Sequence, residues 1–242
     1  MAMQSISMSK VECHEPTEIT VRADGTWRNM IGIDVLTEPG AYPLSILVER
    51  PGGAWTEVVH SIEVSAKVFP TRELTVEPRF VEPPRDVQDR ITREAVRLNR
   101  LYRTVTPRSP LAPMRVPIPS VVTGVFGSRS VFNGQPRNPH AGIDFRGGVG
   151  TPIGSPAGGT IVMVEDLYFT GKTVVIDHGG AMYSILAHMS ATEVRVGQEV
   201  RPGNIVGAVG ATGRVTGPHL HWSIRLLGAR VDPLSVLRLL EE

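Results

Sequence analysis

Glycine and proline divide this chain into short apolar segments. Its 242 residues include 25 glycines and 20 prolines, which interrupt the apolar runs throughout and form no single low-complexity tract. Short apolar runs bounded by turn-forming residues are typical of strands joined by tight turns. We therefore expect a mainly β protein, long enough to bury a substantial core in one large domain or two smaller ones.

Charge and cysteine content exclude few functions. The formal net charge is +1, which gives no reason to expect nucleic acid or acidic lipid as a partner. Cys13 is the only cysteine, so no intramolecular disulfide can form, and the count does not decide the compartment. No apolar run approaches the roughly 18 residues of a transmembrane helix. Residues 1–5 show no signal-peptide pattern, and we interpret them as a start that follows a removed leader.

Residues 1–82 are expected to form a small β-sandwich-like domain of the immunoglobulin type. Asp24-Gly25, between residues 19–21 and 27–35, is a strong hairpin signal. A second hairpin is expected where residues 50–53 separate the apolar runs 42–49 and 55–64. We interpret this domain as a structural or positioning module without chemistry of its own.

Residues 83–119 are expected to connect this domain to a third region, residues 120–242. Within residues 86–102, apolar side chains recur at helical spacing, and the opposite face carries charges of both signs, which argues against a nucleic-acid surface. Prolines between positions 107 and 119 then predict an extended linker. The third region is strand-like as far as Leu226, and Asp232-Pro233 predicts the start of a short final helix.

Two histidines occur two residues apart at the start of an apolar strand. His219 and His221 should project from the same face of that strand, while Leu220 and Trp222 face the other side. A solvated polar face is one explanation. The glycine-rich segment 210–217 just before them is expected to form a loop whose backbone comes close to a neighbouring part of the site. This favours a functional site over a solvated face.

A histidine and an aspartate four residues apart form a second motif. His140 and Asp144 would be neighbours on a helix, but Pro139 and Gly142 argue against one. In a straight strand their Cα atoms would lie roughly 13 Å apart. A bend at Gly142 would bring them together; the alternative is a hydrogen-bonded loop pair.

Combined, the three histidines and one aspartate of the two motifs can supply a set of two imidazoles and one carboxylate. Such a set with an open position is typical of catalytic zinc, which lowers the pKa of a bound water. His188, at the end of an apolar strand, is a candidate for acid–base chemistry. We interpret His178 as structural, and His14 and His60 as surface residues.

These motifs resemble those of the lysostaphin-type peptidases (the M23 or LytM family), bacterial zinc endopeptidases that cut peptide cross-links in cell-wall peptidoglycan. The family has a His-x-x-x-Asp pair, a later histidine after an apolar strand, and a His-x-His motif. The matching segments are residues 140–144, 183–188 and 213–221, with similar flanking turns at 126–129, 150–161 and 196–203. Residues 83–119 and the region before them resemble some Gram-negative members much more weakly.

The resemblance implies an antiparallel β-sheet peptidase domain with one zinc ion per chain. His140, Asp144 and His221 would be the metal ligands, with His188 and His219 beside them. One of these two would accept a proton from the attacking water, and the other would stabilise the oxyanion and later protonate the leaving amine. Which histidine does which stays open.

The resemblance also implies a partner and a location. Peptidoglycan stem peptides are the expected substrate, with a D-Ala–diaminopimelate cross-link favoured over a glycine bridge. We expect a monomer in the periplasm or cell envelope. A block of the open metal position by Cys13, His14 or Glu15 is a further possibility.

Three other functions compete with this interpretation. A catalytically silent scaffold for other cell-wall hydrolases typically lacks a ligand, whereas all five positions are filled here. A mononuclear iron oxygenase also uses two histidines and a carboxylate, but it would leave His188 and His219 without a role. A lipoyl- or biotinyl-carrier module needs a hairpin lysine, and none follows Lys172.

Overall fold

The computed structural model describes residues 5–7, 20–21, 27–28, 30–49, 52–75, 83–107 and 113–241. Its strands confirm the mainly β class. In the first 82 residues they are β1 (Ser5–Ser7), β2 (Thr20–Val21), β3 (Trp27–Arg28), β4 (Gly40–Glu49), β5 (Trp55–Val64) and β6 (Thr71–Leu74). A short 3₁₀ turn, η1 (Arg85–Val87), leads into α2 (Gln88–Leu101).

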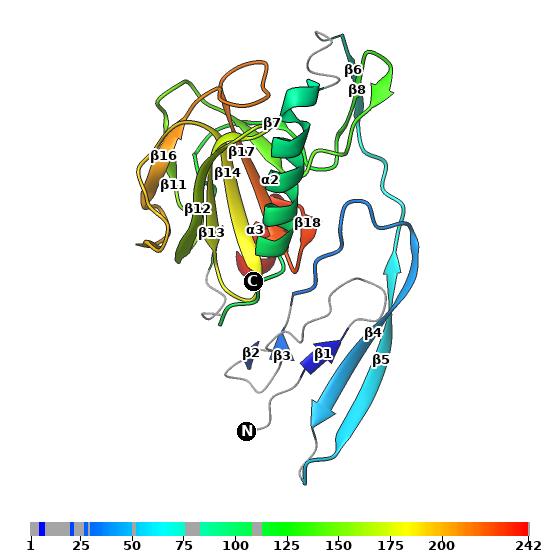
Figure 1. The fold of residues 1–242 in the computed structure, drawn as a ribbon. Helices are drawn as coiled ribbons and strands as arrows, with labels where there is room; N and C mark the ends of the chain where they lie inside the picture. Colours follow the sequence, from blue (N-terminus) through cyan, green and yellow to red (C-terminus); the bar gives the residue numbers. More distant parts are fainter. Residues whose placement is uncertain are drawn as a thin grey trace.

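The C-terminal part forms one large antiparallel sheet (Figure 1). Its remaining elements are β7 (Val122–Gly124), β8 (Arg129–Phe132), β9 (Gln135–Pro136), β10 (Ile143–Arg146), β11 (Pro152–Gly154), β12 (Gly159–Leu167), β13 (Gly171–Asp177), β14 (Met182–Thr192), β15 (Glu199–Val200), β16 (Ile205–Val209), β17 (His219–Leu226), β18 (Ala229–Val231) and α3 (Pro233–Glu241). The strand order is β15-β12-β13-β14-β17-β10-β7, with β16 on β14, β11 on β16, and β18 on β17. β8 and β9 lie outside this sheet and form a separate one with β6, which runs parallel to β8. β14, β17 and β10 are therefore consecutive neighbours in this sheet.

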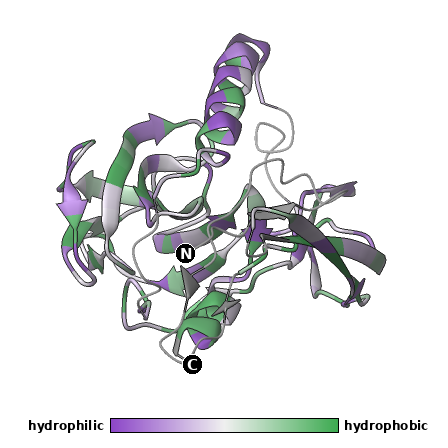
Figure 2. Cartoon of the chain, turned by 90° about the horizontal axis from the view of Figure 1, so that it is seen from below, coloured by the Kyte–Doolittle hydropathy of each residue, from purple (hydrophilic) through white to green (hydrophobic). Residues whose placement is uncertain are grey.

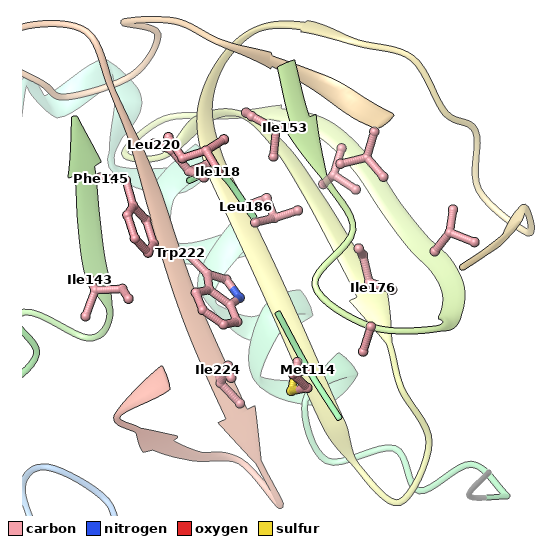
Figure 3. Close-up of a cluster of buried hydrophobic side chains, with 14 of the residues drawn as sticks. Met114, Ile118, Ile143, Phe145, Ile153, Ile176, Leu186, Leu220, Trp222 and Ile224 are labelled. Atoms are coloured by element: carbon pink, nitrogen blue, oxygen red, sulfur yellow. The ribbon is translucent and has the colours of Figure 1, made fainter. Parts of the chain in front are cut away.

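One face of the sheet carries the main hydrophobic core. Leu220 and Trp222 of β17 are fully buried there, with Phe145 of β10 stacked against Trp222 at a ring-centroid distance of 6.5 Å (Figure 3). The predicted alternation along β17 is thus confirmed: its apolar side chains enter the core, and the two histidines face the other side. Helix α3 is largely hydrophobic (Figure 2), and its Val236 and Leu237 belong to the same core.

Helix α2 covers a second, smaller apolar cluster. Tyr102, at its C-terminal end, is buried against Tyr183 of β14, and the Tyr183 hydroxyl donates to the carbonyl of Thr104 at 2.5 Å. On the polar side, Glu94 accepts a hydrogen bond from the backbone N–H of Tyr168, and Arg97 forms an ion pair with Glu165. The predicted amphipathic helix is confirmed, and it is held along the β12–β13 hairpin. No helix among the described residues is long and apolar enough to cross a membrane.

The described strands of the N-terminal region form hairpins. Both predicted hairpins have paired strands, β2 with β3 and β4 with β5, but β3 ends at Arg28, so the expected strand to residue 35 is wrong. Most side chains of β5 are exposed. The described residues form a three-stranded sheet β1-β4-β5 and a separate β2-β3 pair. A sandwich-like domain and its boundary at residue 82 stay predictions.

Part of the expected linker belongs to the core. Met114 and Ile118 are buried in the main cluster, with 5% and 1% of their surface exposed. Residues 113–119 are therefore not the extended connection that the prolines predict, because their apolar side chains have a core face to pack against. The Asp232 cap of α3 is confirmed: its carboxylate accepts from the backbone N–H of Leu234 at 3.1 Å.

An ion pair joins the two halves of the chain. Both Asp34 oxygens accept hydrogen bonds from the Arg230 guanidinium, at 2.6 and 2.8 Å, and the backbone N–H of Leu36 adds another. Burial opposes ionisation of Asp34, but these hydrogen bonds outweigh it and lower the pKa of the carboxyl. A carboxyl with a lowered pKa in the folded state stabilises above its unfolded pKa of about 3.9 and loses that contribution as pH falls.

Replacing Asp34 with asparagine should therefore lower stability at pH 7 and flatten its acid dependence. We expect a loss of about 1 kcal/mol at pH 7, since the pair is partly exposed, and a smaller difference near pH 3. Urea unfolding at both pH values measures this. The control is Asp166→Asn, an exposed side chain on β12. An equal loss at both pH values would contradict the assignment.

Candidate metal centre

Three adjacent strands bring the predicted site residues together. Asp144 of β10 is the direct cross-strand partner of His221 in β17, and His221 in turn lies opposite Ala187 of β14. The next residue of β14 is His188, whose ring centroid is 6.0 Å from that of His221. Neighbouring strands in a sheet are about 5 Å apart, so side chains at matching register positions meet on one face.

His140 reaches the same point through a bend. The chain turns at Gly142, immediately before β10, and places the His140 Nε2 atom 3.0 Å from the Asp144 Oδ1 atom. The predicted bend is present, but its cause differs from the expected conformational freedom. Gly142 does not have a positive φ; instead, a Cβ atom there would collide with the Trp222 carbonyl oxygen and lie 2.9 Å from the His221 ring. Glycine is required because β17 passes so close.

The donor atoms of His140, Asp144 and His221 suit one metal ion. His221 Nδ1 lies 2.8 Å from Asp144 Oδ1 and 3.0 Å from His140 Nε2. Around tetrahedral zinc, with bonds of about 2.0–2.1 Å, donor atoms stand roughly 3.3 Å apart. A small outward shift of each group would accommodate the ion. Two neutral imidazoles and one carboxylate are also the donor types found at catalytic zinc sites with an open position.

Backbone carbonyls fix the orientation of three of the imidazole rings by accepting hydrogen bonds from their Nδ1 atoms. His140 Nδ1 donates to the Val125 carbonyl at 3.0 Å, His188 Nδ1 to Thr212 at 2.9 Å, and His219 Nδ1 to Gly217 at 2.9 Å. With the proton on Nδ1, each neutral ring presents the lone pair of Nε2. For His140 this is the atom that faces the Asp144 carboxylate, to which the protonated ring donates a hydrogen bond; a bound metal would take the place of that proton. For His188 and His219, Nε2 remains to act on a substrate, and the His219 Nε2 atom also lies 3.8 Å from Asp144 Oδ1.

Electrostatics prepare the carboxylate to bind a cation. Burial opposes ionisation of Asp144, but hydrogen bonds from His140 and His221 outweigh it and hold the pKa of the carboxyl far below its usual range. Burial also opposes protonation of His140, yet its bond to Asp144 raises the pKa of that ring. The partly buried His221 has a lowered pKa, chiefly from burial. Asp144 is thus ionised and His221 neutral, the forms in which they bind a metal.

His188 occupies an unusual position in the backbone. The sequence predicts it at the end of a strand, but it lies inside β14, where the pairing with β13 shifts register. Its φ is +62°, in the left-handed region that costs a non-glycine residue about 1–3 kcal/mol. Burial and the nearby His221 lower the pKa of His188 to about 4, so the ring is neutral at pH 7. Its centroid is 4.9 Å from that of His219.

Some contributors to the site carry no sequence signal. Val125, Thr212 and Gly217 act through backbone carbonyls, so their side-chain types reveal nothing; only the glycine-rich loop suggested a close approach of backbone. His178 bonds to the Gly158 carbonyl at 2.7 Å and lies 2.8 Å from the Ser184 hydroxyl, away from the three donors. This agrees with a structural role. Cys13, His14 and Glu15 lie outside the described residues.

Comparisons with known proteins connect this geometry to one family. Residues 138–233 match the model of peptidase family M23. Over 97 residues the chain is 40% identical to the peptidoglycan DD-endopeptidase ShyA of Vibrio cholerae and 41% identical to the DD-carboxypeptidase/endopeptidase Mpg of Neisseria meningitidis. Each match covers 40% of this chain and only 23% or 22% of the relative, so the chain spans less than a quarter of these relatives.

A solved structure extends the likeness to almost the whole chain. The crystal structure of a candidate M23 peptidase from Pseudomonas aeruginosa is 30% identical, with a TM-score of 0.74. The match covers 98% of this chain and 88% of the other. It therefore includes the region before the sheet as well as the strands that carry the histidines. This chain belongs to peptidase family M23.

Proposed function

We propose that the protein is a zinc-dependent endopeptidase that hydrolyses peptide cross-links of bacterial peptidoglycan. The observation that carries the proposal is the convergence of two imidazoles and an ionised carboxylate on one point, with two further imidazoles beside them. Family membership and relatives named peptidoglycan DD-endopeptidases support it. The geometry alone supports metal-assisted hydrolysis, and the relatives suggest the substrate.

His140, Asp144 and His221 would hold one zinc ion per chain. Bound zinc at such a site supplies Lewis-acid chemistry, polarising a carbonyl and making water acidic enough to attack it near neutral pH. The protein prepares this chemistry by keeping Asp144 ionised and by fixing the His140 ring through the Val125 carbonyl.

His188 and His219 would manage the protons. Each ring has its Nδ1 proton bound to a carbonyl, which leaves Nε2 to accept a proton from the attacking water. The second ring, in its protonated form, can donate from Nε2 to the developing oxyanion and later pass that proton to the departing amine. The low pKa of His188 keeps this ring neutral at pH 7, so its Nε2 lone pair is available.

The proposal also covers which cross-link is cut and where in the cell the protein acts. We favour the D-Ala–diaminopimelate cross-link, in keeping with relatives named for DD-endopeptidase activity, over a glycine bridge. Such a substrate places the protein in the periplasm or cell envelope, and a monomer contains all five site residues.

Digestion of purified cell-wall sacculi tests this function. Zinc-loaded protein should release cross-link-derived peptides, identified by mass spectrometry. His219→Ala should slow release by about 10²-fold while zinc content stays at one per chain, because this ring is assigned to proton transfer and not to the metal. No release from any sacculus type would favour the scaffold function. Unchanged release by His219→Ala would refute the role of that ring.

A further inference from the structure

His140 is held in place differently from the two other donor residues. Those two lie in the paired strands β10 and β17, whereas His140 lies in the irregular segment between β9 and β10. Its anchor is the turn formed by residues 125–128, here called the 125–128 turn. Three hydrogen bonds join them: Gly127 N–H to the His140 carbonyl at 2.8 Å, His140 N–H to the Ser128 carbonyl at 2.9 Å, and His140 Nδ1 to the Val125 carbonyl at 3.0 Å. The position of this ring therefore depends on whatever holds the turn.

An aromatic ring from the N-terminal region packs against the 125–128 turn. A Cβ atom at Gly127 would lie 2.1 Å from the Phe69 Cε1 atom and 2.3 Å from Cδ1, so the ring fills the space beside the glycine. Gly127 is buried, and its φ of +77° lies in the left-handed region that favours glycine. The turn is thus shaped to receive the Phe69 ring.

Backbone pairing holds the segment that carries Phe69 against the same region. The backbone N–H of Arg129, immediately after the turn, donates to the Pro70 carbonyl at 2.9 Å. From Thr71 onward, β6 runs parallel to β8 and pairs with one edge of it, while β9 pairs with the other edge (Figure 1). The segment lies outside residues 138–233, which match the family model. A part of the chain beyond that match therefore supports the metal centre.

The burial of Phe69 marks a specific contact. Its neighbour Val68 is 96% exposed, and Lys67 is also exposed, with its Nζ atom 5.2 Å from the centre of the Phe69 ring. Phe69 alone among these three is partly buried. On the turn itself, Phe126 packs against the main core. The turn is therefore fixed both by the core and by the Phe69 ring.

We propose that Phe69 is a positioning residue for His140. Its ring holds the 125–128 turn in the conformation from which the Val125 carbonyl orients the imidazole. Phe69 acts through the turn and is not itself a ligand. This inference rests on the proposed function and assigns part of its metal site to the N-terminal region. Loss of a group that orients a metal-binding ring typically weakens metal binding by about 10–100-fold.

Zinc affinity of the full chain, measured by competition with a chelator, tests this role. Phe69→Ala should bind zinc about tenfold more weakly, because the turn loses the ring that holds it. Phe69→Leu keeps an apolar side chain against Gly127 and should bind within about threefold of the unmodified protein. Val68→Ala, next to it but exposed, should have no effect. If the alanine variant does not fold, Phe69→Val should show a smaller loss, of at least about threefold.

A core variant separates positioning from stability. Leu237, on α3, is 8% exposed in the main core, so Leu237→Ala should unfold at lower urea concentration. Its zinc affinity in the absence of urea should equal that of the unmodified protein, because α3 carries no donor residue.

The outcomes distinguish this inference from the proposed function. Unchanged zinc affinity in the Phe69 variants would overturn the positioning role, as would an equal fall in Leu237→Ala. If Phe69→Ala loses affinity while Phe69→Leu retains it, but the unmodified protein cuts no sacculi, the positioning role stands and the hydrolytic function fails. Absence of zinc binding by the unmodified protein would overturn both.

Discussion

Replacing His221 with alanine should remove zinc and reduce hydrolysis of peptidoglycan by about 10³-fold or more. His221 Nδ1 lies within 3.0 Å of both other donor atoms, so its loss leaves only one imidazole and one carboxylate. Two protein ligands do not hold zinc as three do at a catalytic site. Metal analysis after dialysis, together with peptide release from sacculi, measures both effects.

The matched control is another histidine in the same chain. His60 is exposed on β5, in the arm that projects away from the large sheet (Figure 1), so His60→Ala should keep one zinc per chain and full activity. The cavity left by His221→Ala is a second concern, which His221→Gln addresses by keeping the side-chain volume. Both His221 variants should lose the metal. One zinc per chain in either of them would refute the ligand assignment.

The sequence predicts features of this site that depend on local periodicity. Residues two apart on a strand share a face, so His219 and His221 project together while Leu220 and Trp222 enter the core. The helix at residues 88–101 follows in the same way from apolar spacing. These patterns are properties of one segment and need no knowledge of its neighbours.

Long-range pairing lies beyond such patterns. That Asp144 stands opposite His221 depends on which strands pair and in which register, and 77 residues separate the two. The sequence also cannot reveal that the carbonyls of Thr212 and Gly217 accept hydrogen bonds from the histidines, because every residue has a carbonyl. His188 was misplaced within its strand for a related reason: the register shift and positive φ arise from contacts with β13 and the Thr170 carbonyl.

Outside the sheet, tertiary packing decides which residues are buried. The prolines before residue 120 predict a linker, yet Met114 and Ile118 pack into the core. On β4, Ser45 is buried while Leu44 is only partly covered. Which side chains of this strand are buried depends on the elements that pack against it, and the sequence of the strand alone does not specify those elements.

Replacing Gly142 with alanine should disrupt both the fold and the metal centre. Its φ is not in the left-handed region, so alanine is tolerated by the local backbone, and the cost comes from space alone. The added methyl group would collide with the Trp222 carbonyl and lie 2.8 Å from Ser223 Cβ. Neither can yield without separating β17 from the turn that carries His140. We expect a loss of about 1–3 kcal/mol in the free energy of unfolding, typical of overpacking at a rigid site.

The effect on zinc distinguishes this mechanism from simple destabilisation. Because β17 also carries His221, displacing the turn should move the His140 donor away from the other two and weaken zinc binding by about 10-fold or more, even in protein that is fully folded. Urea unfolding and competition with a chelator measure the two effects. Gly148→Ala is the control, since a methyl group there meets only the Thr151 hydroxyl at 4.0 Å. If Gly142→Ala bound zinc as tightly as Gly148→Ala, the close approach of β17 would be a packing detail and not the feature that sets the ligand geometry.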